Sequence, residues 1–260
     1  MINKFKMLTS LSFSLLFFTP NILADFNELL STIKSNLATN EIYVSSAPQQ
    51  MQIYTDANAE YAGLLADMLG ADPGEISEIK SAKSLGSIYA SSAPQEQANN
   101  TQAFAKYLKL IAQVLDPQNE DITSTSSTMA TNEIYANSAL QQSALRTSAG
   151  FNYLTIIALA SGVDEKLVSD ISSTMRTNDI LASSAYQQNA NYSEATAKLL
   201  KEYATAFEVN KEKLDEIMSS MSTQEIFVDS ALQQVALYEQ TSSKILYLIL
   251  ETLILNNTIG

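Results

Sequence analysis

The stretch EIYANSALQQ at residues 133–142 recurs along the chain, and this recurrence decides the fold. Its copies read EIYVSSAPQQ at 41–50, SIYASSAPQE at 87–96, DILASSAYQQ at 179–188 and EIFVDSALQQ at 225–234. Each copy lies 46 residues from the next, without insertion or deletion. Self-similarity at a fixed period of this length is typical of a repeat architecture, in which one supersecondary unit is copied in tandem.

Four positions of the unit are identical in all five copies, and equivalent positions are called columns below. They are the Ile column (Ile42, Ile88, Ile134, Ile180, Ile226), the Ser column (Ser46, Ser92, Ser138, Ser184, Ser230), the Ala column (Ala47, Ala93, Ala139, Ala185, Ala231) and the Gln column (Gln49, Gln95, Gln141, Gln187, Gln233). Counted from Asp25, the units occupy residues 25–70, 71–116, 117–162, 163–208 and 209–254, and a tail follows at 255–260.

Residues 1–24 have the pattern of a secretory signal peptide. Lys4 and Lys6 precede an apolar run at 7–18, and the segment ends in the small residue Ala24. The run is shorter than the roughly 20 residues of a membrane-spanning helix, although an uncleaved anchor is the alternative. We expect cleavage after Ala24, where the first unit begins. The mature protein is then expected to be exported, periplasmic or extracellular, without an integral membrane span.

The composition indicates a globular, acidic protein. Hydrophobic residues make up 46% of the chain and charged residues 17%, and the net charge is −13. Loss of the signal peptide would leave 13 basic and 28 acidic residues, a net charge of −15. Such a surface opposes binding to nucleic acid, so no nucleic-acid partner is expected. The chain has no cysteine, which excludes disulfides and lipid attachment through cysteine.

The unit itself has the spacing of a short helix followed by a long one. In the fourth copy, the short helix is marked by Val163, Leu167, Val168, Ile171 and Met175. Thr177 is interpreted as the N-cap of a long helix from about 178 to 207, with Ile180 on its apolar stripe. The acidic residue of the motif, Asp179 in this copy, would then complement the helix dipole in the first turn.

Two prolines conflict with a continuous long helix. Pro48 and Pro94 lie nine residues after the proposed cap, where a proline removes a backbone hydrogen bond. The later units carry Leu140, Tyr186 and Leu232 there. A continuous or kinked helix is favoured. A broken helix, giving three helices per unit, and an extended segment at 41–45 remain as alternatives.

The predicted fold is therefore all-α, with five tandem helical hairpins. A hairpin of two helices cannot bury its apolar face alone, so the units are expected to stack as an α-solenoid-like array. A closed helical bundle is the alternative arrangement. The period of 46 residues lies in the range of HEAT and armadillo repeats, which is a likeness of architecture only.

The residue inventory argues against most enzyme chemistry. Without histidine or cysteine, the chain lacks the side chains of Ser-His triads, thiol nucleophiles and most zinc, copper and haem sites. We therefore expect no catalytic residues, no metal and no cofactor. The leading hypothesis is a non-enzymatic protein-binding or scaffold surface. A self-assembling subunit of an extracellular fibre or layer is the alternative, and a carboxylate-based hydrolase is a distant third.

Two sets of residues are candidates for binding. The Ser and Gln columns could form a periodic polar strip for a protein partner, or they could satisfy backbone groups of neighbouring turns. Near the C-terminus, Ile245, Leu248, Ile249 and Leu253 form a candidate patch for self-association, unless they pack onto the fourth unit. The tyrosines of two further columns, which include Tyr43 and Tyr61, are expected to lie in the core.

The run from Ile134 to Gln142 resembles the Leu-Tyr and Ala-Gln stretches of the small R-body (Reb) proteins. The likeness covers one short run per unit. Those proteins carry the motif once and lack a signal peptide, so no function is carried over.

Overall fold

The computed structural model describes residues 19–258, and all the regular structure in this range is helical. The first unit contains α2 (Pro20–Tyr43) and α3 (Ala47–Met68), and the second α4 (Pro73–Tyr89) and α5 (Ala93–Leu115). The remaining pairs are α6 (Glu120–Glu133) with α7 (Ala139–Ala160), α8 (Glu165–Leu181) with α9 (Ala185–Ala206), and α10 (Lys211–Glu225) with α11 (Ala231–Thr258). The all-α prediction is confirmed.

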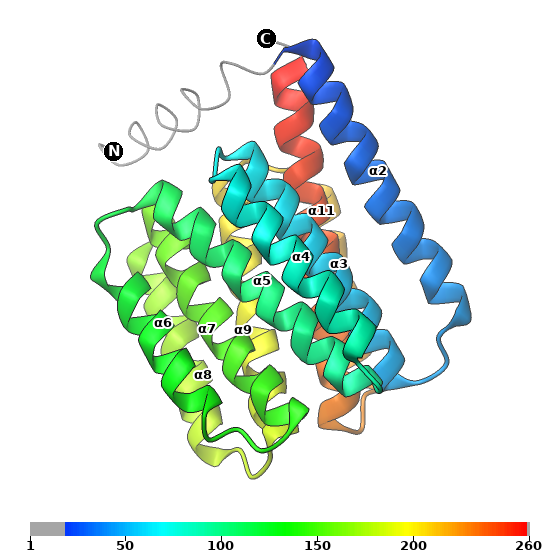
Figure 1. Ribbon diagram of the computed structural model, residues 1–260, viewed down its shortest axis with the longest axis vertical. Helices are drawn as coiled ribbons and strands as arrows, with labels where there is room; N and C mark the ends of the chain where they lie inside the picture. Colours follow the sequence, from blue (N-terminus) through cyan, green and yellow to red (C-terminus); the bar gives the residue numbers. More distant parts are fainter. Residues whose placement is uncertain (1–18, 259–260) are drawn as a thin grey trace.

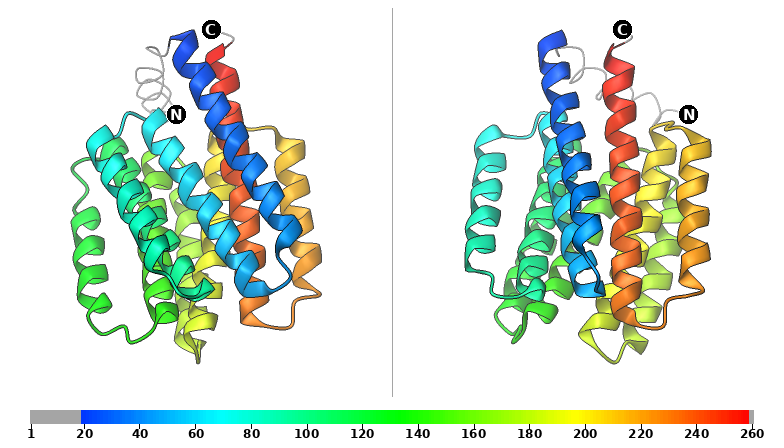
Figure 2. Two further views of the ribbon diagram at one scale, coloured as in Figure 1. Left: turned by 45° about the vertical axis from the view of Figure 1, so that its right-hand side comes forward. Right: turned by 90° about the vertical axis from the view of Figure 1, so that its right-hand side faces the viewer.

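The second helices of the five units form a closed inner bundle. Helices α3, α5, α7, α9 and α11 pack side by side in chain order, and α11 packs in turn against α3 (Figures 1 and 2). This last contact joins the final unit to the first. Of the two arrangements that the sequence left open, the contact pattern therefore corresponds to the closed bundle.

The first helices of the units lie outside this bundle. Helices α4, α6, α8 and α10 each pack mainly on the inner helix that follows them in the chain. Helix α2 differs, because it packs on both α3 and α11 and so covers the seam where the bundle closes. The outer layer is therefore equivalent in four units and different in the first.

The boundary between the two helices of a unit lies seven residues later than we predicted. Thr177 is inside α8, where its hydroxyl donates to the carbonyl oxygen of Ser173. The inner helix α9 instead begins after its N-cap Ser184. The prediction of a continuous long helix was wrong, and each unit contains two helices with the break at the motif. Pro48 lies in the first turn of α3, where an amide hydrogen is not needed by the helix.

Three of the four turns between units end the inner helix with a left-handed residue, and the exception is Asp116 with φ of −145°. Gly70 and Gly162 have φ of 81° and 82°. After each, a backbone amide donates five residues back, from Ala71 to Ala66 and from Val163 to Ala158, as in a Schellman motif. Glu208 occupies the same column with φ of 55°. Glycine there removes the cost that a Cβ atom imposes on this conformation.

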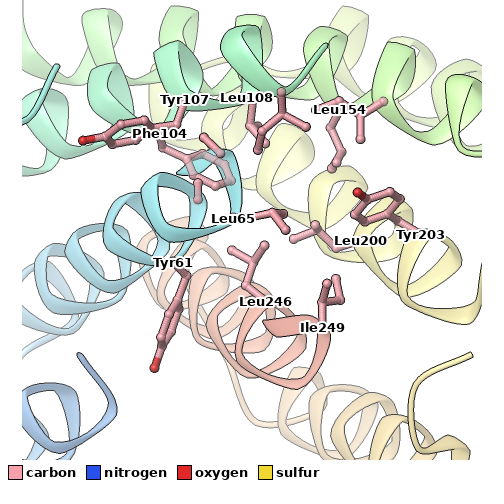
Figure 3. Close-up of a cluster of buried hydrophobic side chains, with 14 of the residues drawn as sticks. Tyr61, Leu65, Phe104, Tyr107, Leu108, Leu154, Leu200, Tyr203, Leu246 and Ile249 are labelled. Carbon is pink, nitrogen blue, oxygen red and sulfur yellow. The ribbon is translucent and has the colours of Figure 1, made fainter. Parts of the chain in front are cut away.

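The bundle interior changes character along its axis. On α7, buried positions follow steps of four and three residues, through Ser143, Thr147, Gly150, Leu154 and Ile157. This is the spacing of the inward face of a parallel helical bundle. On α7 the buried residues of the motif end are small or polar and those of the other end are apolar, whereas α3 and α11 place the apolar Met51 and Val235 at the motif end. Figure 3 shows the apolar end, where Leu65, Leu154, Leu200 and Leu246 converge from different inner helices.

The apolar C-terminal run belongs to this core. Ile245, Leu248, Ile249 and Leu253 are at most 4% exposed, because α11 packs against both α9 and α3. The candidate association patch is therefore corrected: these four residues are not on the surface.

Helix α2 runs continuously from Pro20 through Ala24, and Leu23 is buried. The signal-peptide assignment falls mainly on residues 1–18, outside the described residues, so cleavage after Ala24 stays a prediction.

Candidate functional site

Ten large apolar side chains project from one end of the molecule. They are the Ile column and the residue that follows each isoleucine, and we call them the crown: Ile42, Tyr43, Ile88, Tyr89, Ile134, Tyr135, Ile180, Leu181, Ile226 and Phe227. Each is between 74% and 84% exposed. Large apolar side chains normally lose most of their accessible surface on folding, so this concentration is unusual.

The crown is exposed because of where the outer helices end. Each pair lies in the last turn of an outer helix or directly after it, before the chain turns back into the inner helix. The outer helices point in one direction, so the five pairs gather at one end. The start of α2 and the end of α11 lie at the other (Figures 1 and 2). Our assignment of Ile180 and Tyr43 to the apolar interior was wrong.

The Ser and Gln columns shape the turns that carry the crown. The Gln187 side-chain oxygen accepts from the backbone amide of Ser183, while the amide of Gln187 donates to the Ser184 hydroxyl oxygen. This reciprocal pair is a capping box at the start of the inner helix. Corresponding bonds are made by Gln49, Gln95, Gln141 and Gln233. The columns thus have a structural role, and whether they also bind a partner stays a prediction.

In the first, third and fourth units the acidic residue before the isoleucine connects the outer helix to the inner one. The Tyr54 hydroxyl donates to Glu41 over 2.8 Å, and the Tyr192 hydroxyl donates to Asp179 over 3.2 Å. In the third unit Arg146 takes the place of the tyrosine and pairs with Glu133 at 2.7 Å. Burial, followed by the bond to Glu41, raises the pKa of Tyr54. These acids lie near the ends of outer helices, so the expected role at a helix start is corrected.

Acidic residues surround the crown, and basic residues do not. The five turn segments at 39–50, 85–96, 131–142, 177–188 and 223–234 contain no lysine or arginine. They contain six acidic residues: Glu41, Glu96, Glu133, Asp179, Glu225 and Asp229. The crown therefore combines exposed apolar surface with negative charge.

Grooves lie along the outer helices. One of about 480 Å³ lies beside α2 at the seam, is lined by Tyr61, Tyr247 and Leu248 among others, and reaches Glu41 at the first tip. Its cations are largely engaged, because Lys34 donates to the Tyr247 hydroxyl and Lys213 pairs with Glu251. A second groove of about 420 Å³ contains Asp56 and Glu60. Both carboxylates pair with Lys83, so they are engaged in a structural ion pair.

The polar end of the bundle interior holds a buried carboxyl group. Glu239 on α11 accepts from the Ser193 hydroxyl and from the Asn58 amide, both at 2.7 Å. Burial raises the pKa of Glu239, and these two hydrogen bonds lower it in part. Gln97 and Asn189 lie four residues before the column that contains Glu239. They have buried side-chain atoms without a hydrogen-bond partner among the described residues. The groove at the seam borders this region, because its lining includes Ser243, whose hydroxyl donates to the side-chain oxygen of Asn58 at 2.6 Å.

Within residues 19–258, no three carboxylate groups lie close enough together to hold a metal ion. In the same range, no helix combines the length and apolar character that crossing a membrane requires. No protein-family model, curated protein or solved structure matches the chain.

Proposed function

We propose that this chain is an exported, non-enzymatic repeat protein that binds another protein and acts as a scaffold, with the crown as its binding face. The observation that carries the proposal is the exposure of ten large apolar side chains at one end of a closed bundle. Ten such side chains present on the order of 1,000 Å², beyond the largest apolar patch of a typical monomer.

The way the crown is held also supports a binding role. In each turn a Gln-column side chain accepts from a backbone amide, as Gln187 does. At the first, third and fourth tips an acid is also bonded to the inner helix, as at Asp179. A rigid tip loses little conformational entropy when it binds, which favours affinity. Five tips repeated around one bundle further favour a partner that contacts several of them together.

A photo-crosslinking amino acid at Tyr135 tests the proposal in intact cells that export the protein. The matched control carries it at Leu159, which is exposed near the C-terminal end of α7, the inner helix that follows Tyr135 in the chain. We expect covalent adducts with a different protein from position 135 and none from position 159. Loss of these adducts when Ile88, Tyr89, Ile180 and Leu181 are replaced by serine would tie them to the crown.

Other outcomes of this experiment contradict the proposal. Adducts that contain only two copies of this chain would favour the alternative of a self-assembling subunit, which no longer rests on Ile245 to Leu253 because those residues are buried. Equal adducts from both positions, or none from either, would remove the crown as a specific binding face.

Export is tested separately. N-terminal sequencing of the protein recovered outside the cytoplasm should begin at Asp25. A first residue of Met1 in that material would contradict cleavage after Ala24.

A further inference from the structure

Resting on the proposed function, we infer that the surface docked on the crown is cationic as well as apolar: a protein segment that interleaves lysine or arginine with large apolar side chains. The juxtaposition behind this inference is that the five turn segments that carry the ten exposed apolar side chains contain six acidic residues and no lysine or arginine.

Each of the five turn segments contains an acidic residue, including the one whose motif has no acid before the isoleucine. Four tips carry an acid directly before the isoleucine, at Glu41, Glu133, Asp179 and Glu225. The second tip has Ser87 there, but it has Glu96 where the other units have glutamine. The second unit therefore lacks the usual acid and gains another in the same turn segment. Glu96 is half-buried and accepts a hydrogen bond from the side-chain amide of Gln52 on α3.

Two of the six acids, Glu41 and Asp229, are exposed, and the other four are half-buried. The phenols that bond Glu41 and Asp179 are neutral donors, so they do not cancel the carboxylate charge. Only the third tip is neutralised by an ion pair, between Glu133 and Arg146. A cation that approaches the crown is therefore attracted by the exposed carboxylates, and this attraction weakens as salt rises.

This charge pattern favours some possible binding partners of the crown over others. Two crowns that met face to face would bring two sets of carboxylates together, which disfavours a second copy of the chain. Anionic lipid is disfavoured for the same reason. A basic amphipathic segment is favoured both by apolar burial and by charge attraction, because its apolar side chains cover the apolar pairs of the crown while its cations approach the acids.

The test uses two synthetic 18-residue amphipathic helical peptides, one of leucine and lysine and one of leucine and glutamate. Binding to the purified mature protein is followed by fluorescence anisotropy. We expect the lysine peptide to bind at least tenfold more tightly than the glutamate peptide, with an affinity that falls as salt rises.

Two sets of variants assign this binding to the crown. In the crown set, Glu41→Gln, Asp179→Asn, Glu225→Gln and Asp229→Asn remove charge while the acids at the bonded positions keep an acceptor oxygen. The control set removes four exposed charges from the outer helices elsewhere, by Glu78→Gln, Asp170→Asn, Asp215→Asn and Glu216→Gln. We expect tenfold or greater loss from the crown set and less than threefold from the control set. A third variant, Ile134→Ser with Tyr135→Ser, should also weaken binding.

The remaining outcomes overturn the inference. Equal affinity of the protein for both peptides would contradict a cationic partner. Equal loss of affinity for the lysine peptide in both sets of variants would also contradict it. So would crown-dependent binding to phosphatidylcholine vesicles, or a dimer in sedimentation that the Ile134→Ser, Tyr135→Ser variant abolishes. If crosslinking from position 135 finds a different protein while the lysine peptide is not preferred, the proposed function stands and only this inference fails.

Discussion

The side-chain amide of Asn58 on α3 donates to the carboxyl group of Glu239 on α11 over 2.7 Å. This bond joins residues 181 positions apart, from the first and last units, and it lies in the interior of the bundle. It is therefore a polar counterpart of the apolar contacts that close the ring. A buried carboxyl group held in this way makes the closure sensitive to pH.

We expect Glu239→Gln to stabilise the protein at neutral pH. Burial raises the folded pKa of Glu239 above the unfolded value of about 4.3, so the folded state binds the proton more tightly. The contribution of this group is complete below about pH 4.3 and is lost as the pH rises through the folded pKa, at about 1.4 kcal/mol per pH unit. The difference in unfolding free energy between Glu239→Gln and wild type should therefore grow between pH 5 and pH 8 in urea titrations.

The exposed Glu78 on α4 provides the control for this experiment. Glu78→Gln should shift stability by less than about 0.5 kcal/mol, equally at both pH values. A difference for Glu239→Gln that stays constant from pH 5 to pH 8 would contradict a raised pKa.

Arg146→Tyr should lower the unfolding free energy less than Arg146→Ala does. Tyr54 and Tyr192 occupy the same column and bond the acid 13 residues before them, as Arg146 bonds Glu133. Arg146→Ala leaves Glu133 without its partner and should cost about 2–3 kcal/mol in chemical denaturation. Arg146→Tyr should recover part of this loss but not all, because Arg146 also donates to the carbonyl oxygen of Ala98 on α5. Equal losses of stability for both variants would show that tyrosine cannot take the place of Arg146 in this column.

The Gln column should matter for stability through its turn. Gln187→Ala removes the side-chain oxygen that accepts from Ser183, and by the usual cost of a lost cap we expect about 1 kcal/mol of destabilisation. The adjacent Gln188, which is half-buried, is the control, and Gln188→Ala should cost less than about 0.5 kcal/mol. If the two variants lost equal stability in thermal melts, the capping role of the column would be refuted.

The two tyrosine columns should respond to substitution in opposite ways. Tyr135 is 74% exposed in the crown, whereas Tyr153 is 1% exposed in the core. Tyr135→Ser should change the unfolding free energy by less than about 0.5 kcal/mol, while Tyr153→Ala should cost about 3–5 kcal/mol. A large loss of stability from Tyr135→Ser would mean that the crown packs within the molecule.

These contrasts explain how far the sequence could lead. The 46-residue period and the helical spacing were sufficient for an all-α repeat fold, and the second tyrosine column, with Tyr61 and Tyr153, was placed correctly in the core. The period could not distinguish an open array from a closed one, because it repeats the local hairpin without specifying the rotation between units. That rotation depends on the packing of α11 against α3.

The helix boundary and the crown were missed for a related reason. Thr177 and Ser184 are both acceptable N-cap residues, and the apolar Ile180 between them suggested a buried stripe. Two signals favoured the later boundary: a glutamine three residues after each Ser of the Ser column, and a proline two residues after Ser46 and Ser92. Once the break lies there, Ile180 and Leu181 fall in the final turn of an outer helix, beyond its contacts with the inner one.

The closed ring predicts the effect of removing the last unit. Deletion of residues 209–260 would expose the faces of α3 and α9 that α11 covers, together with Asn58, which would lose its bond to Glu239. In an open array a terminal unit is removed with a loss of stability close to its own contribution. Here two distant units lose their neighbour together, so we expect the shortened chain to lose its cooperative thermal transition by circular dichroism. Deletion of residues 255–260 is the control, since it removes only the tail after the fifth unit, which begins with the exposed Leu255. A shortened chain that still melted cooperatively, with an enthalpy smaller in proportion to its length, would show that closure contributes little to the fold.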